Sequence, residues 1–96
     1  HFPVDVYLPA NHHVRSVMDI DDARLVSVTV SGSPAMLQDE ASVAMRARGW
    51  KPVMVMAHEQ ARMLSFQKDR RAATMTLLAA EDGRVQFNVQ LTARSP

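Results

Sequence analysis

Residues 33–50 read SPAMLQDEASVAMRARGW, and this stretch decides the fold because it encodes one well-bounded amphipathic helix. Ser33 is a favourable N-cap, and Pro34 suits the first helical position, where a missing N–H costs nothing. Gly49 suits the left-handed conformation that ends a helix, and Trp50 is then expected to return to the core. The apolar stripe of the helix consists of Leu37, Ala41, Ala44 and Met45, with Met36 and Val43 at its margin.

Alternating apolar and polar side chains predict strands on both sides of this helix. The clearest segment places Val85 and Phe87 on one face of a strand and Gln86 and Asn88 on the other. Asp82-Gly83 supplies the turn before it, since these residues adopt the backbone angles of a tight hairpin. The predicted strands cover about residues 25–30, 53–58, 63–68, 74–78 and 85–91.

The N-terminal part of the chain predicts a further extended segment. Residues 2–9, FPVDVYLP, are bracketed by prolines, which are tolerated at the edges and ends of sheets. We expect a weakly held sheet edge here, a short strand at residues 12–17 and an acidic turn at residues 19–22. The element order is β-β-α-β-β-β-β, or one strand fewer if residues 2–17 do not all pair. The sequence therefore predicts an α+β fold, with one amphipathic helix on one face of an antiparallel sheet of about five strands.

Composition narrows the class of protein. The 96 residues predict a single domain spanning residues 1–96, and because the first residue is His1, we expect it to be excised from a longer or processed chain. Eleven Lys and Arg against ten Asp and Glu give a net charge of +1, which disfavours nucleic-acid binding. No cysteine is present, and no apolar run approaches the roughly 20 residues that cross a bilayer. No catalytic motif or cofactor-binding motif is apparent, so we expect a non-enzymatic domain.

Met54, Met56 and His58 form the sharpest candidate site. Thioether and imidazole groups suit a soft ion such as Cu(I), and side chains two residues apart on a strand share a face. Trp50 followed by the Met-x-Met phrase is loosely similar to periplasmic copper chaperones of the small β-barrel type, a resemblance that implies Cu(I) binding. The other interpretation is that Met54 and Met56 fill the core beneath the helix, as methionine often does. We predict packing as the main role, with the Cu(I) site as the alternative.

Three other groups of residues have a functional and a structural interpretation. His12 and His13 are adjacent on an extended segment and point to opposite faces, so we expect exposed histidines and no shared metal. A basic cluster consists of Lys68, Arg70 and Arg71. It could bind a phosphate or an anionic lipid head, and the other interpretation is that it forms a solvated turn. A polar sheet face suits either solvent or a docking partner, and it comprises Ser27, Thr29, Thr74, Thr76, Gln86, Asn88 and Gln90.

Three short phrases carry a family resemblance. FPVDVYLPA at residues 2–10, the helix end Arg46-Ala47-Arg48-Gly49-Trp50, and LSFQKDR at residues 64–70 resemble a loose class of small bacterial cell-envelope domains. That class usually opens closer to D-V-P-x-Y-P, whereas here Asp5-Val6 is followed by Tyr7-Leu8-Pro9. The resemblance implies a secreted or lipoprotein-type origin, a periplasmic or envelope-associated location and a binding role with a protein partner.

Overall fold

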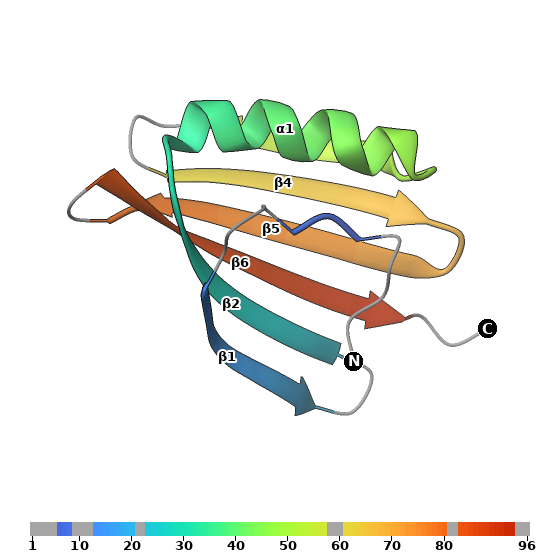
Figure 1. The fold of residues 1–96 in the computed structure, drawn as a ribbon. Coiled ribbons are helices and arrows are strands. Elements are labelled where there is room, and N and C mark those ends of the chain that lie inside the picture. Colours follow the sequence, from blue (N-terminus) through green and yellow to red (C-terminus); the bar gives the residue numbers. More distant parts are fainter. Residues whose placement is uncertain (1–5, 9–12, 21–22, 58–60, 81–82, 94–96) are drawn as a thin grey trace.

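The computed structural model describes residues 6–8, 13–20, 23–57, 61–80 and 83–93, and it confirms the α+β prediction. One helix packs on a six-stranded antiparallel sheet whose strand order is β1-β2-β6-β5-β4-β3 (Figure 1). The sheet thus has slightly more strands than expected. The strands are β1 (His13–Ile20), β2 (Ala23–Ser31), β3 (Lys51–Ala57), β4 (Ala61–Lys68), β5 (Arg71–Ala79) and β6 (Arg84–Ala93).

The helix α1 (Pro34–Ala47) begins and ends where the sequence predicts. The Ser33 hydroxyl accepts a hydrogen bond from the Met36 backbone N–H at 3.2 Å, which satisfies one of the unpaired donors at the helix start. Gly49 has a φ of 93°, in the region where a side chain would be strained. Leu37, Ala41 and Met45 are buried, so the predicted stripe is the face that meets the sheet.

The core lies between α1 and the inner face of the sheet. α1 packs mainly against β3, β4 and β5, so it covers little of the inner face of β6 and β2. Residues 6–8 lie over this remaining part, in front of the sheet in Figure 1, and the Tyr7 ring meets the Phe87 ring edge-on at 6.0 Å. The buried sheet residues are Val26, Val28, Val30, Leu64, Phe66, Ala73, Met75, Leu77, Val85, Phe87, Val89 and Leu91.

The prediction that residues 2–9 form a sheet edge is wrong for the part of the segment that the structure describes. Residues 6–8 form no strand, and Val6 is buried in the core. The Tyr7 backbone N–H donates to the Met45 sulfur at 3.4 Å, which connects this segment to α1. The physical reason is that one helix covers only half of a six-stranded sheet, so the apolar side chains of residues 6–8 complete the cover. The rest of the predicted segment lies outside the described residues.

The first strand is longer than the sequence indicates. β1 extends to Ile20, whereas the sequence predicts a strand only to residue 17. Asp19, which the sequence places in an acidic turn, lies opposite Arg24 in the β1–β2 ladder and forms a salt bridge with its Nε at 2.7 Å. Opposite charges on directly opposite residues stabilise an antiparallel strand pair, which explains why β1 continues through Asp19. Residues 21 and 22 of the predicted turn lie outside the described residues.

Candidate functional site

The side of the sheet opposite α1 carries side chains in rows that cross five or six strands. From β1 to β3, one row reads Met18, Leu25, Gln90, Thr74, Ser65 and Met54. The next row reads Ser16, Ser27, Asn88, Thr76, Met63 and Met56. A third row, from β1 to β4, reads His13, Thr29, Gln86, Leu78 and Ala61. We call the residues of these three central rows the outer face, and none of them is Asp, Glu, Lys or Arg, whereas the flanking positions on the same side of the sheet include Lys51 and Arg84.

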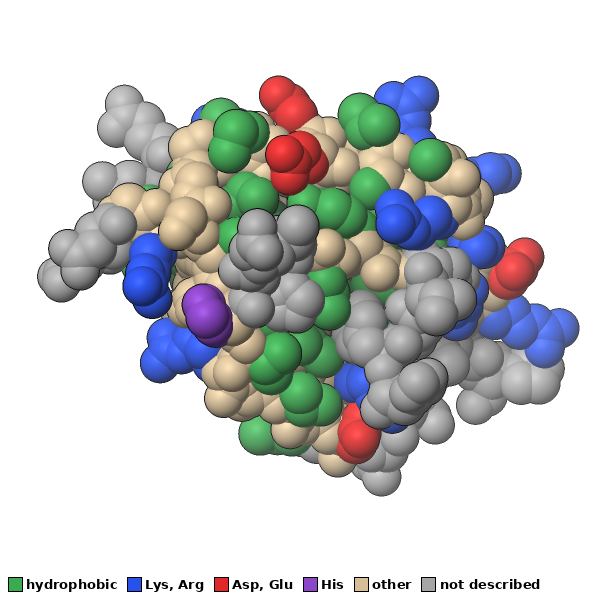
Figure 2. All heavy atoms as spheres, viewed as in Figure 1, with side chains coloured by type: hydrophobic (Ala, Val, Ile, Leu, Met, Phe, Trp, Pro, Cys, Tyr) green, Lys and Arg blue, Asp and Glu red, His purple; other side chains and the backbone are tan. Residues whose placement is uncertain are grey.

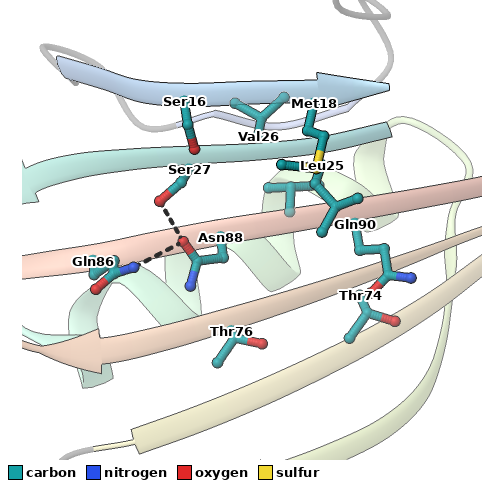
Figure 3. A pocket seen from close by; sticks show the side chains of 11 residues that line it. Ser16, Met18, Leu25, Val26, Ser27, Thr74, Thr76, Gln86, Asn88 and Gln90 are labelled. Atoms are coloured by element: carbon teal, nitrogen blue, oxygen red, sulfur yellow. Dashed lines mark hydrogen bonds between the residues drawn. The ribbon is translucent and has the colours of Figure 1, made fainter. Parts of the chain in front are cut away.

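The register therefore brings together all seven polar residues that the sequence assigns to one face. The Ser27 hydroxyl hydrogen-bonds the Asn88 side-chain oxygen at 2.6 Å, and the Gln86 amide nitrogen donates to the same oxygen at 3.4 Å. A hollow of about 420 Å³ opens beside them (Figure 3). Met18 and Leu25 lie at one end of this hollow and the hydrogen-bonded amides at the other. The outer face thus offers neutral hydrogen-bonding groups with an apolar border.

The predicted packing of Met54 and Met56 under the helix is wrong. Both side chains point to the outer face, opposite Ser65 and Met63 on β4, and both are exposed. The alternation of Val and Met shows that the two types point to opposite faces, but it does not say which face the helix covers. Val55, which is on the inner side, is also exposed, because β3 lies at the margin of the helix cover.

Met54, Met56 and Met63 consequently lie on one face, with Met56 directly opposite Met63. His58, the third member of the predicted Cu(I) set, lies outside the described residues, so the structure does not place it relative to the methionines. The adjacent Met63 is a thioether that the sequence interpretation missed. Its pairing with Met56 depends on the β3–β4 register, which is not evident from either strand alone.

The free edge of β3 carries a continuous run of exposed apolar side chains. β3 is an edge strand of the sheet, and all seven of its residues are exposed. Val53, Met54, Val55 and Met56 are 62%, 41%, 51% and 46% exposed. Residues 52–57 contain no charged side chain. Proteins usually protect edge strands with charges, prolines or bulges, and here Pro52 and a register shift between Pro52 and Met54 protect only the start of the strand.

A basic cluster occupies the end of the molecule where α1 ends (Figure 2). The last helical turn, the start of β3 and the β4–β5 turn meet here, since the Lys68 ammonium donates to the Arg48 carbonyl at 2.7 Å. The Arg71 guanidinium carbon lies 5.0 Å from the centre of the Trp50 ring. Lys68 and Arg71 are therefore engaged in packing the turn against the helix end. This basic end contains Arg46, Arg48, Lys51, Lys68, Arg70 and Arg71, with Asp69 among them.

Tyr7 is the residue whose electrostatics depart most clearly from ordinary values in the described chain. Its hydroxyl donates to a Glu40 carboxylate oxygen at 2.9 Å. Partial burial, and then this hydrogen bond to a negative acceptor, raise the pKa of Tyr7 well above its ordinary value of 10.0. The neutral phenol is favoured, so Tyr7 is a structural donor that connects the N-terminal segment to α1.

The described residues supply little for catalysis or for a conventional metal site. No polar or charged side chain among them is fully buried, and no three His, Asp or Glu side chains of that set are grouped to hold a metal ion. His13 is exposed on β1, while His12 lies outside the described residues. Within the part of the chain that the structure describes, no helix is long and apolar enough to span a membrane.

Comparison with known proteins leaves the family of this chain open. Neither the protein-family models nor the curated protein sequences include a match. The resemblance of the short phrases to bacterial envelope domains therefore stays a prediction.

Proposed function

We propose that this domain is a non-enzymatic interaction module that docks a protein partner on its outer face. The observation that carries the proposal is the lack of any charged side chain in the three described rows of that face. The central parts of protein interfaces are depleted in charged residues and enriched in Met, because desolvating a charge is costly. Met18, Met54, Met56 and Met63 lie on β1, β3 and β4, towards the two sides of this face, and add apolar contact area to it.

The composition of the outer face also favours protein over other ligands. Sheet surfaces that bind RNA present several aromatic rings on which bases stack, and the three rows contain no Phe, Tyr or Trp and a single His. Phosphate binding draws on Lys and Arg, which the same rows lack. Side-chain amides and hydroxyls can instead exchange hydrogen bonds with a polar, neutral protein surface. The short envelope-type phrases support a periplasmic or secreted setting for this interaction.

The test is to place charge in the centre of the outer face. Thr74→Arg with Thr76→Arg adds two positive charges there, and Ala35→Arg with Val43→Arg adds two at exposed positions of α1 as the matched control. A partner recovered with the wild-type domain and then purified should bind wild type and the control, and bind the outer-face variant at least about tenfold more weakly. Equal thermal midpoints would show that all three chains fold. A partner that binds the outer-face variant as well as wild type would contradict the proposal.

A second candidate function is Cu(I) binding, and one observation favours it. Met56 and Met63 lie directly opposite each other, where Cβ atoms are about 4.5–5.5 Å apart, so both thioethers can reach one ion. Met54 lies on the same face, two residues from Met56 along the strand. Thioether sulfur is a ligand that Cu(I) prefers. The candidate set is thus Met54, Met56 and Met63, with His58 retained from the sequence.

Competition with a Cu(I) chelator tests this candidate. Trp50 fluorescence is a poor readout, because its ring is buried on the opposite side of the sheet. Met56→Leu with Met63→Leu should abolish binding if the outer-face thioethers hold the ion, while His58→Ala tests the set predicted from sequence. The exposed Met36→Leu is the matched control on α1. Binding that is unchanged in the double variant would exclude the methionine site.

A further inference from the structure

The β3 edge presents a second interaction surface, which adjoins the outer face and shares Met54 and Met56 with it. Its exposed run Val53–Met54–Val55–Met56 is bounded by Pro52 at one end, and the unpaired side of the strand faces solvent in the described structure. The opposite edge of the sheet, β1, carries Arg15 and Asp19, whose charges discourage strand pairing. The two edges therefore differ in how well they resist a further strand.

We propose that β3 pairs with β3 of a second copy of this chain, antiparallel and centred on Val55, to make one continuous sheet. Directly opposite residues of a ladder share a face, so a two-fold pairing must be centred on a residue and not between two residues. Centring on Val55 places it opposite itself on the inner side. Met54 then lies opposite Met56 of the second copy on the outer side.

The sequence of β3 favours pairing with β3 of a second copy. Residues 53–57 are uncharged, so self-pairing brings no like charges opposite each other in the ladder. Pro52, which has no N–H to donate, falls outside the paired stretch. The valine and methionine side chains of one copy contact those of the other, so each copy covers the exposed apolar surface of its partner.

The distribution of charge selects the antiparallel arrangement. The basic end, with its six Lys and Arg side chains, lies at the Lys51 end of β3. Parallel pairing would bring two such ends side by side. Antiparallel pairing separates them by about the length of the strand, roughly 23 Å for seven residues, which is beyond the range of strong repulsion at physiological salt.

The size of the interface sets the strength of the pairing. Five residues of each copy contribute, and a single pair of edges buries less than the ~1,000 Å² of a stable specific interface. The pairing is therefore weak and reversible, and it depends on the concentration of the chain. It also enlarges the outer face, because the outer rows of the two copies run into each other at β3.

Sedimentation equilibrium over a wide concentration range tests the proposal. Wild type should shift from monomer to dimer, and Val55→Lys should weaken the association by about tenfold or more, since it places two like charges opposite each other. Val17→Lys is the matched control, an equally exposed valine on the inner side of the β1 edge. It should associate as wild type does. A wild-type chain that stays monomeric throughout, or an equal loss in both variants, would overturn the proposal.

Cross-linking tests the register independently, because the chain has no cysteine of its own. Val55→Cys should oxidise to a disulfide-linked dimer, since directly opposite residues lie within disulfide reach. In an equal mixture of Met54→Cys and ¹⁵N-labelled Met56→Cys, mixed dimers should exceed same-variant dimers. Val17→Cys should cross-link far more slowly. A predominance of Met54→Cys dimers linked to themselves would overturn the antiparallel register.

Discussion

The Arg71 guanidinium lies over the buried Trp50 ring, 5.0 Å from its centre, and this contact joins the β4–β5 turn to the end of α1. The Lys68 ammonium is 6.0 Å from the same ring and also donates to the Arg48 carbonyl. One aromatic side chain thus connects the helix terminus, the first residues of β3 and a hairpin turn. These contacts give Lys68 and Arg71 a structural role at this end of the domain.

Trp50→Ala should lower the free energy of unfolding by about 3–5 kcal/mol, because it leaves a large cavity in the core. The ring is only 2% exposed, which confirms the predicted core position. Arg71→Ala, which removes only the cation over the ring, should cost about 0.5–2 kcal/mol. Urea denaturation measures both changes. A Trp50→Ala midpoint close to that of wild type would contradict the role of the ring.

Gly49→Ala should destabilise the domain more than Gly83→Ala does. Both glycines have a positive φ, 93° and 70°, so each substitution strains the backbone. At Gly49 an added Cβ would also lie 3.3 Å from the Lys68 Cε, whereas at Gly83 nothing among the described atoms lies within 4 Å. We expect about 1–2 kcal/mol at Gly49 and about 1 kcal/mol or less at Gly83. Equal shifts of the thermal midpoint in the two variants would show that the Lys68 side chain moves away from the added Cβ at no cost in stability.

Tyr7→Phe should reduce the loss of stability at alkaline pH. The folded-state pKa of Tyr7 is raised above its ordinary value, so its contribution to stability is fully present below pH 10 and declines as pH rises through the folded pKa. Unfolding free energies compared from pH 8 upward should fall more steeply for wild type than for the variant. Tyr7 is the only tyrosine, so ultraviolet absorbance reports its ionisation directly. Ionisation near pH 10 in the folded chain would contradict the predicted shift.

Ser33→Ala should destabilise the domain by about 0.5–2 kcal/mol, because it leaves a helix-start N–H without its acceptor. Ser33→Asp keeps an acceptor and adds a charge favourable to the helix dipole, so it should retain most of the stability. Thermal denaturation followed by circular dichroism measures both. Equal loss in the two variants would show that the Met36 N–H does not depend on this cap.

The helix and β6 could be predicted closely because local signals coincide there. Ser33, Pro34 and Gly49 bound the helix chemically, and Val85 to Leu91 alternate without interruption. β3 could not be predicted as well, because its two faces are both partly apolar. The side to which Met54 points depends on the β3–β4 register and on the part of the sheet that α1 covers, and both are properties of the assembled sheet.

The same limit applies to the candidate site. The polar residues of the outer face are recognisable in each strand, but their joining into an uncharged surface depends on the strand order. Met63 joins Met54 and Met56 only through the β3–β4 register. Val6 lies in an alternating segment that indicates a sheet strand, so its observed core position follows instead from the area that one helix leaves uncovered.

The position of β6 in the middle of the sheet has a consequence for folding during synthesis. β2, which precedes the helix, pairs along its length with the last strand, from Ala23 opposite Thr92 to Ser31 opposite Arg84. Until β6 leaves the ribosome, the β1–β2 hairpin has no neighbour in the sheet, and β5 also lacks one of its two partners. Closing this contact across some sixty residues is slow relative to local hairpins. Synthesis of β6 is therefore the event that joins two separate pieces of sheet into one.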